Sequence, residues 1–242
     1  MNLKSMIGKP LRKIFPPAPV PKPTQPKAPV VRPDKWIEKY QVKTFIDVGA
    51  HNGEFIDWWL ERFADLDIYA FEPLPDLARE LEKKYASNNR IKVFPVALGA
   101  ESAETTLHVS SYAPSSSLLP MGELHKSEFP HTAGSVQKKI RVESLDEVLR
   151  NVELKDDLLI KIDTQGFEDQ VIKGGRETIK KAKLILIEVS FAHLYVGQSL
   201  FHEIYSMLHE MDFEFAGMRN QILSPTDKSV LQAHAWFRKK NS

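Results

Sequence analysis

Phe45–Glu54, with the sequence FIDVGAHNGE, is the most informative stretch for the fold. It has the pattern of a strand that ends at Val48, a turn with two glycines and the start of a helix. Gly49 and Gly53 lack a Cβ atom, so the backbone N–H groups of the turn and the positive end of the helix can approach a ligand closely. In an open parallel sheet, ligands bind beyond the carboxyl ends of the strands. The stretch therefore predicts a ligand site at the exit of the first strand.

Outside this stretch the chain alternates between strand-like and helix-like patterns. Strands are predicted at 43–48, 67–72, 90–97, 105–109, 137–142, 158–163, 184–189, 213–218 and 231–237. Helices are predicted at 53–64, 75–86, 144–149, 167–181 and 200–211, the fourth of them broken at Gly174–Gly175. Strands that alternate with helices predict a doubly wound α/β domain, with a mainly parallel sheet and helices on both faces.

Residues 1–33 differ from the rest of the 242-residue chain. They carry seven basic residues, no acidic residue and nine of the sixteen prolines, whereas the net charge of the whole chain is +1. Proline restricts its own backbone and that of the residue before it, so we expect a basic, disordered arm at 1–33 and one folded domain at 34–242. Apolar residues recur at helical spacing within 1–15, which is compatible with weak contact to a membrane surface or an acidic partner.

Composition narrows the compartment and the chemistry. The absence of cysteine excludes disulfides, zinc–thiolate sites and cysteine nucleophiles. No apolar run is long enough to cross a bilayer, and no signal-peptide pattern precedes the prolines. We therefore expect a cytoplasmic protein, with peripheral contact to the inner face of a membrane only through the arm. The domain is acidic overall, so nucleic acid is not expected as a partner.

The exits of the first strands indicate which ligand the site holds. The dinucleotide fingerprint G-x-G-x-x-G is absent because position 51 is histidine, and the motif G-x-x-x-x-G-K-[ST] is absent too. Asp47, just before the turn, would repel a phosphate and suits a cationic ligand. Glu72, at the end of the second strand, can accept hydrogen bonds from both hydroxyls of a ribose. A nucleoside pocket with carboxylates and no phosphate grip fits S-adenosylmethionine, with its adenine near Val96–Gly99.

Five motifs resemble those of the FkbM-type S-adenosylmethionine-dependent methyltransferases. They are Phe45–Gly53 (FIDVGAHNG), Phe71–Pro75 (FEPLP), Val96–Gly99 (VALG), Ile160–Glu168 (IKIDTQGFE) and Leu186–Glu188 (LIE). The resemblance covers nearly all of the folded domain and implies a class I methyltransferase (Rossmann-like) fold, whose seven-stranded, mostly parallel sheet has its last strand antiparallel. It also implies methyl transfer from S-adenosylmethionine to oxygen, often a hydroxyl of a sugar, a glycan or a secondary metabolite.

The resemblance also implies roles for individual residues. Cofactor contacts carry over onto the glycine turn, the ribose acid and the residues near the base: Asp47, Gly49, Ala50, His51, Gly53, Glu72, Ala97 and Leu98. Gln165 stands where many relatives have a glutamate, which puts in doubt any role for a second acid there. The segment 111–135 is too long for a plain connection and is typical of a lid or a disordered loop, and its Ser117 is a further candidate contact to the cofactor or the acceptor.

Three residues are candidates for activating the acceptor, because a hydroxyl is a weak nucleophile that gains from a base within hydrogen-bond reach. Asp163, at the exit of the strand at 158–163, is the first candidate, although it could instead only accept amides of its own turn. Glu188 ends an apolar strand, where a charge is costly unless it is paired or faces the site. His193 follows in a loop at the same edge. Asp163 and Glu188 would suit a divalent metal, but their spacing does not demand one and no metal ligand is assigned.

Two alternative interpretations stay open. A nicotinamide-dependent oxidoreductase can use a similar sheet, but the missing third glycine and Asp47 argue against it. A non-catalytic interaction module that keeps the fold could dock on an acidic partner through the basic arm. In the methyltransferase interpretation, the expected partner is a small-molecule or glycan acceptor.

Overall fold

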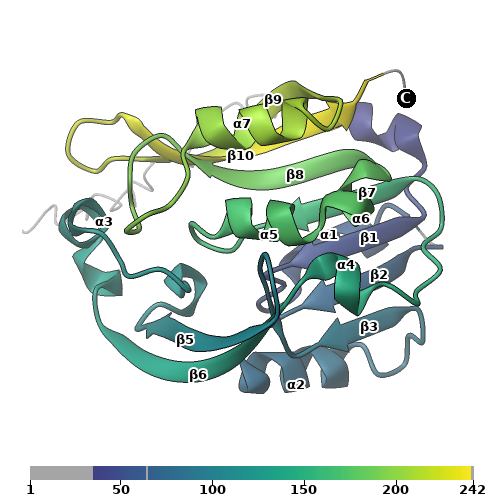
Figure 1. Ribbon diagram of the computed structural model, residues 1–242, viewed down its shortest axis with the longest axis horizontal. Helices are drawn as coiled ribbons and strands as arrows, with labels where there is room; N and C mark the ends of the chain where they lie inside the picture. The colour runs from purple at the N-terminus through teal and green to yellow at the C-terminus, as the bar shows by residue number, and fades with distance from the viewer. Residues whose placement is uncertain (1–34, 64, 241–242) are drawn as a thin grey trace, which may run out of the picture. The chain divides into compact units, whose positions relative to one another are not determined.

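A seven-stranded sheet forms the centre of the structure, with its strands in the order β3-β2-β1-β7-β8-β10-β9 (Figure 1). This computed structural model describes residues 35–63 and 65–240, and the arm predicted at 1–33 lies outside these ranges. In the part of the chain so described, no helix is both long enough and apolar enough to cross a membrane.

The sheet has the topology that the sequence predicts. Its strands are β1 (Thr44–Val48), β2 (Asp67–Phe71), β3 (Ile91–Phe94), β7 (Leu158–Ile162), β8 (Ala182–Ser190), β9 (Phe213–Leu223) and β10 (Val230–Lys239). Parallel pairing runs from β3 through β2, β1 and β7 to β8, and β10 is antiparallel to both of its neighbours. The prediction of a class I sheet with its last strand antiparallel is confirmed. The strand order reverses between β1 and β7, and such a switch point is where open α/β sheets bind their ligands.

Helices cover both faces of the sheet (Figure 1). The 3-10 helix η1 (Lys35–Tyr40), α1 (Glu54–Leu60) and α2 (Pro75–Lys84) pack on one face. The other face is covered by α4 (Leu145–Val148), α5 (Glu168–Gly174), α6 (Arg176–Lys180) and α7 (Phe201–His209). A doubly wound domain is therefore confirmed.

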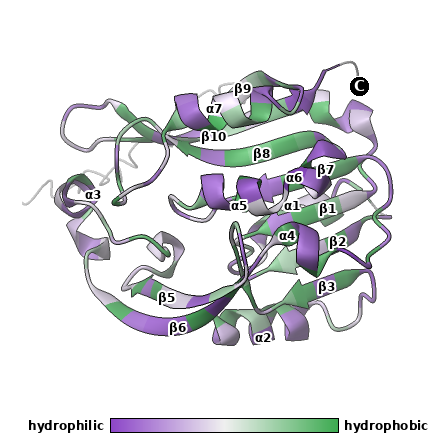
Figure 2. Cartoon of the chain, viewed as in Figure 1, coloured by the Kyte–Doolittle hydropathy of each residue, from purple (hydrophilic) through white to green (hydrophobic). Residues whose placement is uncertain are grey.

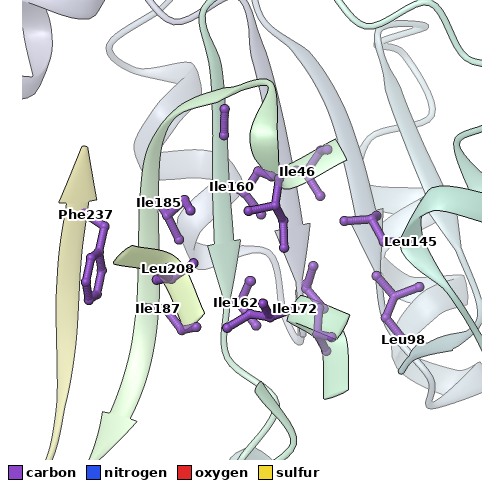
Figure 3. Close-up of a cluster of buried hydrophobic side chains, with 14 of the residues drawn as sticks. Ile46, Leu98, Leu145, Ile160, Ile162, Ile172, Ile185, Ile187, Leu208 and Phe237 are labelled. Atoms are coloured by element: carbon purple, nitrogen blue, oxygen red, sulfur yellow. The ribbon is translucent and has the colours of Figure 1, made fainter. Parts of the chain in front are cut away.

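Alternation of side chains along the central strands separates the core into two layers. On β8, Ile185 and Ile187 face α4 to α7, whereas Leu186 faces α1 and α2. Figure 3 shows the first layer, where isoleucines of β1, β7 and β8 meet Ile172 of α5 and Leu208 of α7. Figure 2 shows β8 in hydrophobic colours over much of its length, as expected for a strand buried on both sides.

A second sheet of three strands, in the order β4-β6-β5, follows β3 in the chain. It consists of β4 (Ala97–Leu98), β5 (Ala103–Ser110) and β6 (Ser135–Glu143). The single strand predicted at 90–97 is thus divided, because β3 stays in the main sheet while β4 pairs with β6. The segment between β5 and β6 forms helix α3 (Glu123–Glu128) and the 3-10 helices η2 (Ala113–Ser115) and η3 (Pro130–Thr132), so it has helical structure of its own.

The predicted helix break at Gly174–Gly175 separates α5 from α6. A Cβ atom on Gly174 would lie 1.9 Å from the backbone oxygen of Gly99, which directly follows β4. Only glycine permits so close an approach, so Gly174 is what lets the end of α5 contact the end of β4.

Candidate active site

A cavity of about 270 Å³ lies at the carboxyl ends of β1, β2 and β7. Its wall consists of the turn after β1, residues 71–74 after β2, residues 96–98 around β4, most of the segment 112–118, and four residues from 161 to 165. The cavity therefore occupies the switch point of the sheet, and the segment that follows β5 contributes one side of it.

Backbone hydrogen bonds join the turn after β1 to the end of β2. The N–H groups of Gly49 and Ala50 both donate to the backbone oxygen of Phe71, at 3.0 Å each. The N–H group of His51 donates to Oε2 of Glu72 at 2.9 Å. All three amides are thus used within the protein, and the turn offers no set of free N–H groups for a phosphate.

Glu72 presents a buried carboxylate to the cavity. Its Oε1 atom accepts the N–H group of Leu74 at 2.9 Å, so each carboxylate oxygen has one backbone partner and a remaining lone pair. Burial raises the pKa of Glu72, although the two backbone donors act in the opposite direction. The backbone holds this carboxyl in one orientation, as a site for two neighbouring hydroxyl groups requires.

Strand register brings five polar residues to the face of the sheet that α1 covers. Asp47 on β1 lies opposite Lys161 on β7, and Glu188 on β8 lies opposite His234 on β10. Asp163 directly follows β7, and its N–H group donates to the backbone oxygen of the last residue of β1 at 3.1 Å. Since side chains alternate, the apolar neighbours of these residues fill the opposite face, and the polar groups gather beside the cavity.

Lys161 is the buried cation of this polar group. Its Nζ atom donates to the backbone oxygen of Gly49 at 2.8 Å and lies 3.2 Å from Asp47 Oδ1 and 3.7 Å from Asp163 Oδ2. Its ammonium group also lies 4.9 Å from the centre of the Phe55 ring. Burial alone would lower the pKa of Lys161, but the two aspartates raise it above its usual value, so the amine stays charged.

Gln165 joins the acidic groups beyond Lys161. Its Nε2 atom donates to Asp163 Oδ1 at 2.9 Å and to Glu188 Oε2 at 2.7 Å, and its Oε1 atom accepts the hydroxyl of Tyr195 at 2.9 Å. An amide can donate to two carboxylates at once, whereas a glutamate at position 165 would have no donor when ionised and only one when protonated. The glutamine at this position is therefore matched to its acidic neighbours.

The two acids next to Gln165 differ in charge state. Burial would raise the pKa of Asp163, but Lys161 and the contacts with His234 and Gln165 hold it well below its usual range. Burial and the charges of Asp163 and Glu168 raise the pKa of Glu188 well above its usual value. The surroundings thus favour the ionised form of Asp163 and the protonated form of Glu188.

Glu168 shapes the turn that carries Gln165. Its carboxylate accepts the N–H groups of Thr164 at 2.8 Å and of Gly166 at 3.0 Å, so it closes residues 164–166 from within. Burial raises the pKa of Glu168 to about 7 despite these donors. Glu168, and not Asp163, is therefore the acid that accepts the amides of this turn.

Most of the predicted site residues line the cavity. These are Gly49, Ala50, His51, Glu72, Ala97, Leu98 and Ser117 among the cofactor candidates, and Asp163 among the catalytic candidates. Asp47 and Gly53 are buried behind the wall, and Asp47 contributes only through Lys161. Glu188 does not line the cavity, but its Oε2 atom accepts a hydrogen bond from Gln165, which does. The side chain of His193 is exposed, away from this group.

Sequence reasoning missed two members of the polar group. Lys161 interrupts the apolar strand LLIKI, and a charge at such a position must be paired, so the signal was present. His234 lies within β10, far along the chain, and only the register of the antiparallel pair brings it to Glu188. Its Nε2 atom lies 3.4 Å from Asp163 Oδ2, while its Nδ1 atom is buried with no hydrogen-bond partner among the described residues.

Comparison with known proteins identifies a family. A model described as the methyltransferase FkbM domain matches residues 47–215. A curated relative, the 2-O-methyltransferase NoeI of Sinorhizobium fredii (strain NBRC 101917 / NGR234), is 26% identical over 169 residues, which are 67% of this chain and 70% of that protein.

Solved structures of low sequence identity resemble the chain in part. A magnesium protoporphyrin IX methyltransferase from Synechocystis PCC 6803, with bound SAM, has a TM-score of 0.46 and 10% identity, with coverage of 84% of this chain and 74% of that one. For a putative sarcosine dimethylglycine methyltransferase from Galdieria sulphuraria, the TM-score is 0.47, the identity 9%, and the coverage 86% and 85%.

Removing the buried amine tests its role in holding the site together. We expect Lys161→Met to lower the free energy of unfolding by about 3–5 kcal/mol at neutral pH, because Asp47 and Asp163 lose their counter-charge. The loss should shrink at acidic pH, where protonated carboxyls need no partner. Denaturant titration at several pH values measures this.

The exposed pair of Lys180 with Glu177 supplies the control. Lys180→Met should cost less than about 1 kcal/mol, since exposed ion pairs contribute little. Adding Asp47→Asn to Lys161→Met should restore part of the lost stability. Equal losses in the two lysine variants would contradict the role given to Lys161.

Glu168 makes stability depend on pH in a defined direction. Its pKa is about 7 in the folded chain, well above the usual value of 4.5 for a glutamate, so the folded state holds this proton more tightly than the unfolded state does. The associated stability is fully present below pH 4.5 and is lost as the pH rises through 7. We therefore expect the stability of the wild type, relative to Glu168→Gln, to fall by about 2–3 kcal/mol across that interval.

Thermal or denaturant unfolding at each pH gives the two curves. Glu177→Gln, at an exposed carboxylate on α6, is the matched control and should follow the wild-type curve. A wild-type curve parallel to that of Glu168→Gln would show that Glu168 does not hold a proton in the folded state.

Proposed function

The chain belongs to the FkbM methyltransferase family, and on that premise we propose that it transfers the methyl group of S-adenosylmethionine to a hydroxyl oxygen of a sugar, a glycan or a secondary metabolite. Transfer to oxygen is supported by the relative that acts as a 2-O-methyltransferase. The choice of cofactor is supported by the donors and charges at the cavity.

Glu72 is the observation that carries the proposal. Both of its oxygens are fixed by backbone donors and keep a lone pair for a ribose hydroxyl, which is the role of an acid at the end of the second strand of a nucleotide-binding sheet. Apolar side chains of Leu74, Leu77 and Val96 line the same cavity and suit the faces of an adenine ring. The residues therefore fit a nucleoside.

The glycine turn favours S-adenosylmethionine over a dinucleotide cofactor. The amides at positions 49–51 are already used by Phe71 and Glu72, so no cradle for a pyrophosphate is left. Carboxylates of Glu72 and Asp163 line the wall and favour a ligand that carries positive charge. Both features support S-adenosylmethionine over a nicotinamide cofactor.

When bound, S-adenosylmethionine would supply a methyl group on a cationic sulfur, which the acceptor oxygen could displace, with the carbon–sulfur electron pair left on sulfur and the hydroxyl proton passed to water. The chain contributes position and charge to this step. Asp163 is the acid at the wall that accepts the hydrogen bond of the acceptor hydroxyl, and Lys161 and Gln165 hold it in place. The segment 112–118 covers one side of the cavity and helps to exclude water.

Transfer of label tests the function directly. The purified chain is incubated with S-adenosylmethionine labelled in its methyl group and with a panel of sugars, glycans and small hydroxyl compounds. We expect label in a product that resists mild base, as an ether does and a methyl ester does not. Saturable cofactor binding without label transfer to any hydroxyl compound of the panel or of a cell extract would favour the non-catalytic interaction module.

The ribose assignment predicts a loss of cofactor affinity. Glu72→Ala should weaken binding of S-adenosylmethionine at least tenfold, because two charge-assisted hydrogen bonds are lost. Isothermal calorimetry measures the affinity. Asp76→Asn, at an exposed acid of α2, serves as the control and should bind as the wild type does. An unaltered affinity in Glu72→Ala would refute the assignment.

Asp163 should matter for turnover more than for binding. We expect Asp163→Asn to keep cofactor affinity within a few-fold and to lower turnover by about a hundredfold or more, since the acceptor hydroxyl loses its ionised partner. Steady-state rates of label transfer and calorimetry on the same preparation separate the two effects. Unchanged turnover would remove Asp163 from the reaction.

A further inference from the structure

We propose that Asp163, Glu188 and His234 bind one divalent transition-metal ion, for which Mn²⁺ is the test case. Each residue presents one ligand atom, and the three atoms lie within 4.8 Å of one another. The residues come from the exit of β7 and from β8 and β10, which are neighbours in the sheet. Ligands held by adjoining strands are already close to a common centre before any ion arrives.

The geometry and the ligand types suit such an ion. Two carboxylates and an imidazole are ligands that Mn²⁺, Fe²⁺ and Zn²⁺ accept. An ion about 2.1 Å from each ligand atom places those atoms roughly 3–4.3 Å apart. The distance between His234 Nε2 and Asp163 Oδ2, 3.4 Å, already falls in that interval. The other two distances are at most 4.8 Å, so a small movement of the side chains would bring them into it.

The donors around the group fix both carboxylates and leave Asp163 Oδ2 without a short hydrogen bond. Gln165 donates to Asp163 Oδ1, and Gln165 and Gln232 both donate to Glu188 Oε2. Among the described residues, Asp163 Oδ2 faces Lys161 and His234, at 3.7 and 3.4 Å. His234 has no short hydrogen bond among the described residues, which is unusual for a ring that is mostly buried.

The ion pairs of the group leave Glu188 without a counter-charge. In the described part of the chain, Lys161 lies within ion-pair distance of Asp47 and Asp163, whereas no lysine or arginine forms an ion pair with Glu188. A cation held by Asp163 and Glu188 would supply that counter-charge and displace the proton that burial favours on Glu188. The ammonium group of Lys161 donates to the backbone oxygen of Gly49 and lies closer to Asp47, at 3.2 Å, than to Asp163, at 3.7 Å.

A bound ion would also act on the acceptor, and this consequence rests on the proposed function. Asp163 lines the cavity, so an ion on its Oδ2 atom lies next to the position of the acceptor hydroxyl. A metal-bound hydroxyl loses its proton at a lower pH than a free one, which raises its nucleophilicity. Metal binding itself does not depend on the methyl acceptor and can be measured without it.

Calorimetric titration of the full chain with MnCl₂, after removal of metals by a chelator, tests the site. We expect one saturable site in the wild type and at least tenfold weaker binding in Glu188→Gln and in His234→Gln. His193→Gln, which alters an exposed histidine outside the group, should bind Mn²⁺ as the wild type does. Circular dichroism and thermal unfolding of each variant establish that it is folded.

A spectroscopic readout distinguishes ligation from an indirect effect. Electron spin-echo measurements of the bound Mn²⁺ should show coupling to an imidazole nitrogen in the wild type, and His193→Gln should keep that coupling. His234→Gln should lose it. The proposal is overturned if the wild type shows no saturable Mn²⁺ site, or if folded Glu188→Gln and His234→Gln bind the ion with wild-type affinity. Neither result would bear on label transfer, so this proposal and the proposed function can fail separately.

Discussion

The buried ammonium group of Lys161 is the interaction on which the site depends. It lies between the exits of β1 and β7, the two strands that flank the switch point, and bonds to the backbone of one and to carboxylates of both. A Cβ atom on Gly49 would lie 2.0 Å from the backbone oxygen of Asp163, so the two exits touch where the amine joins them. One group thereby holds both the turn that lines the cavity and Asp163, the acid for which we propose a contact with the acceptor.

The two faces of the sheet differ in the polarity of their side chains. The face under α4 to α7 is apolar along the central strands and supplies stability through burial. The face under α1 is apolar near the start of the strands and polar at their carboxyl ends, where Phe55 of α1 covers Lys161 and His234. Burying charges there is costly, and the cost is offset by pairing each group with a neighbour. The polar end is the part of the sheet beside the cavity, where we propose that the reaction takes place.

Much of this arrangement could be predicted from the sequence because it is local. The strand–turn–helix pattern of Phe45–Glu54, the acid at the end of the second strand and the glycine break in the fourth predicted helix each depend on a few adjacent residues. Alternation on β1, β7 and β8 would even have placed Asp47, Lys161 and Glu188 on one face. His234 could not be found in this way, since its position depends on the register of β10 against β8.

Other differences arise from tertiary pairing. The strand expected at 90–97 divides because β4 finds its partner in β6, more than forty residues later, and no local pattern specifies that partner. Asp47 and Gly53 belong to the right motif but lie behind the cavity wall: Asp47 pairs with Lys161, and Gly53 accepts the hydroxyl of Tyr85. The motif alone therefore does not distinguish residues that line the cavity from residues that support the turn.

The most direct test of the account is a crystal structure of the chain with S-adenosylhomocysteine. The account predicts that both ribose hydroxyls lie within hydrogen-bond distance of the Glu72 carboxylate, with the sulfur directed toward Asp163. A ligand bound elsewhere, or a ribose that makes no contact with Glu72, would contradict it.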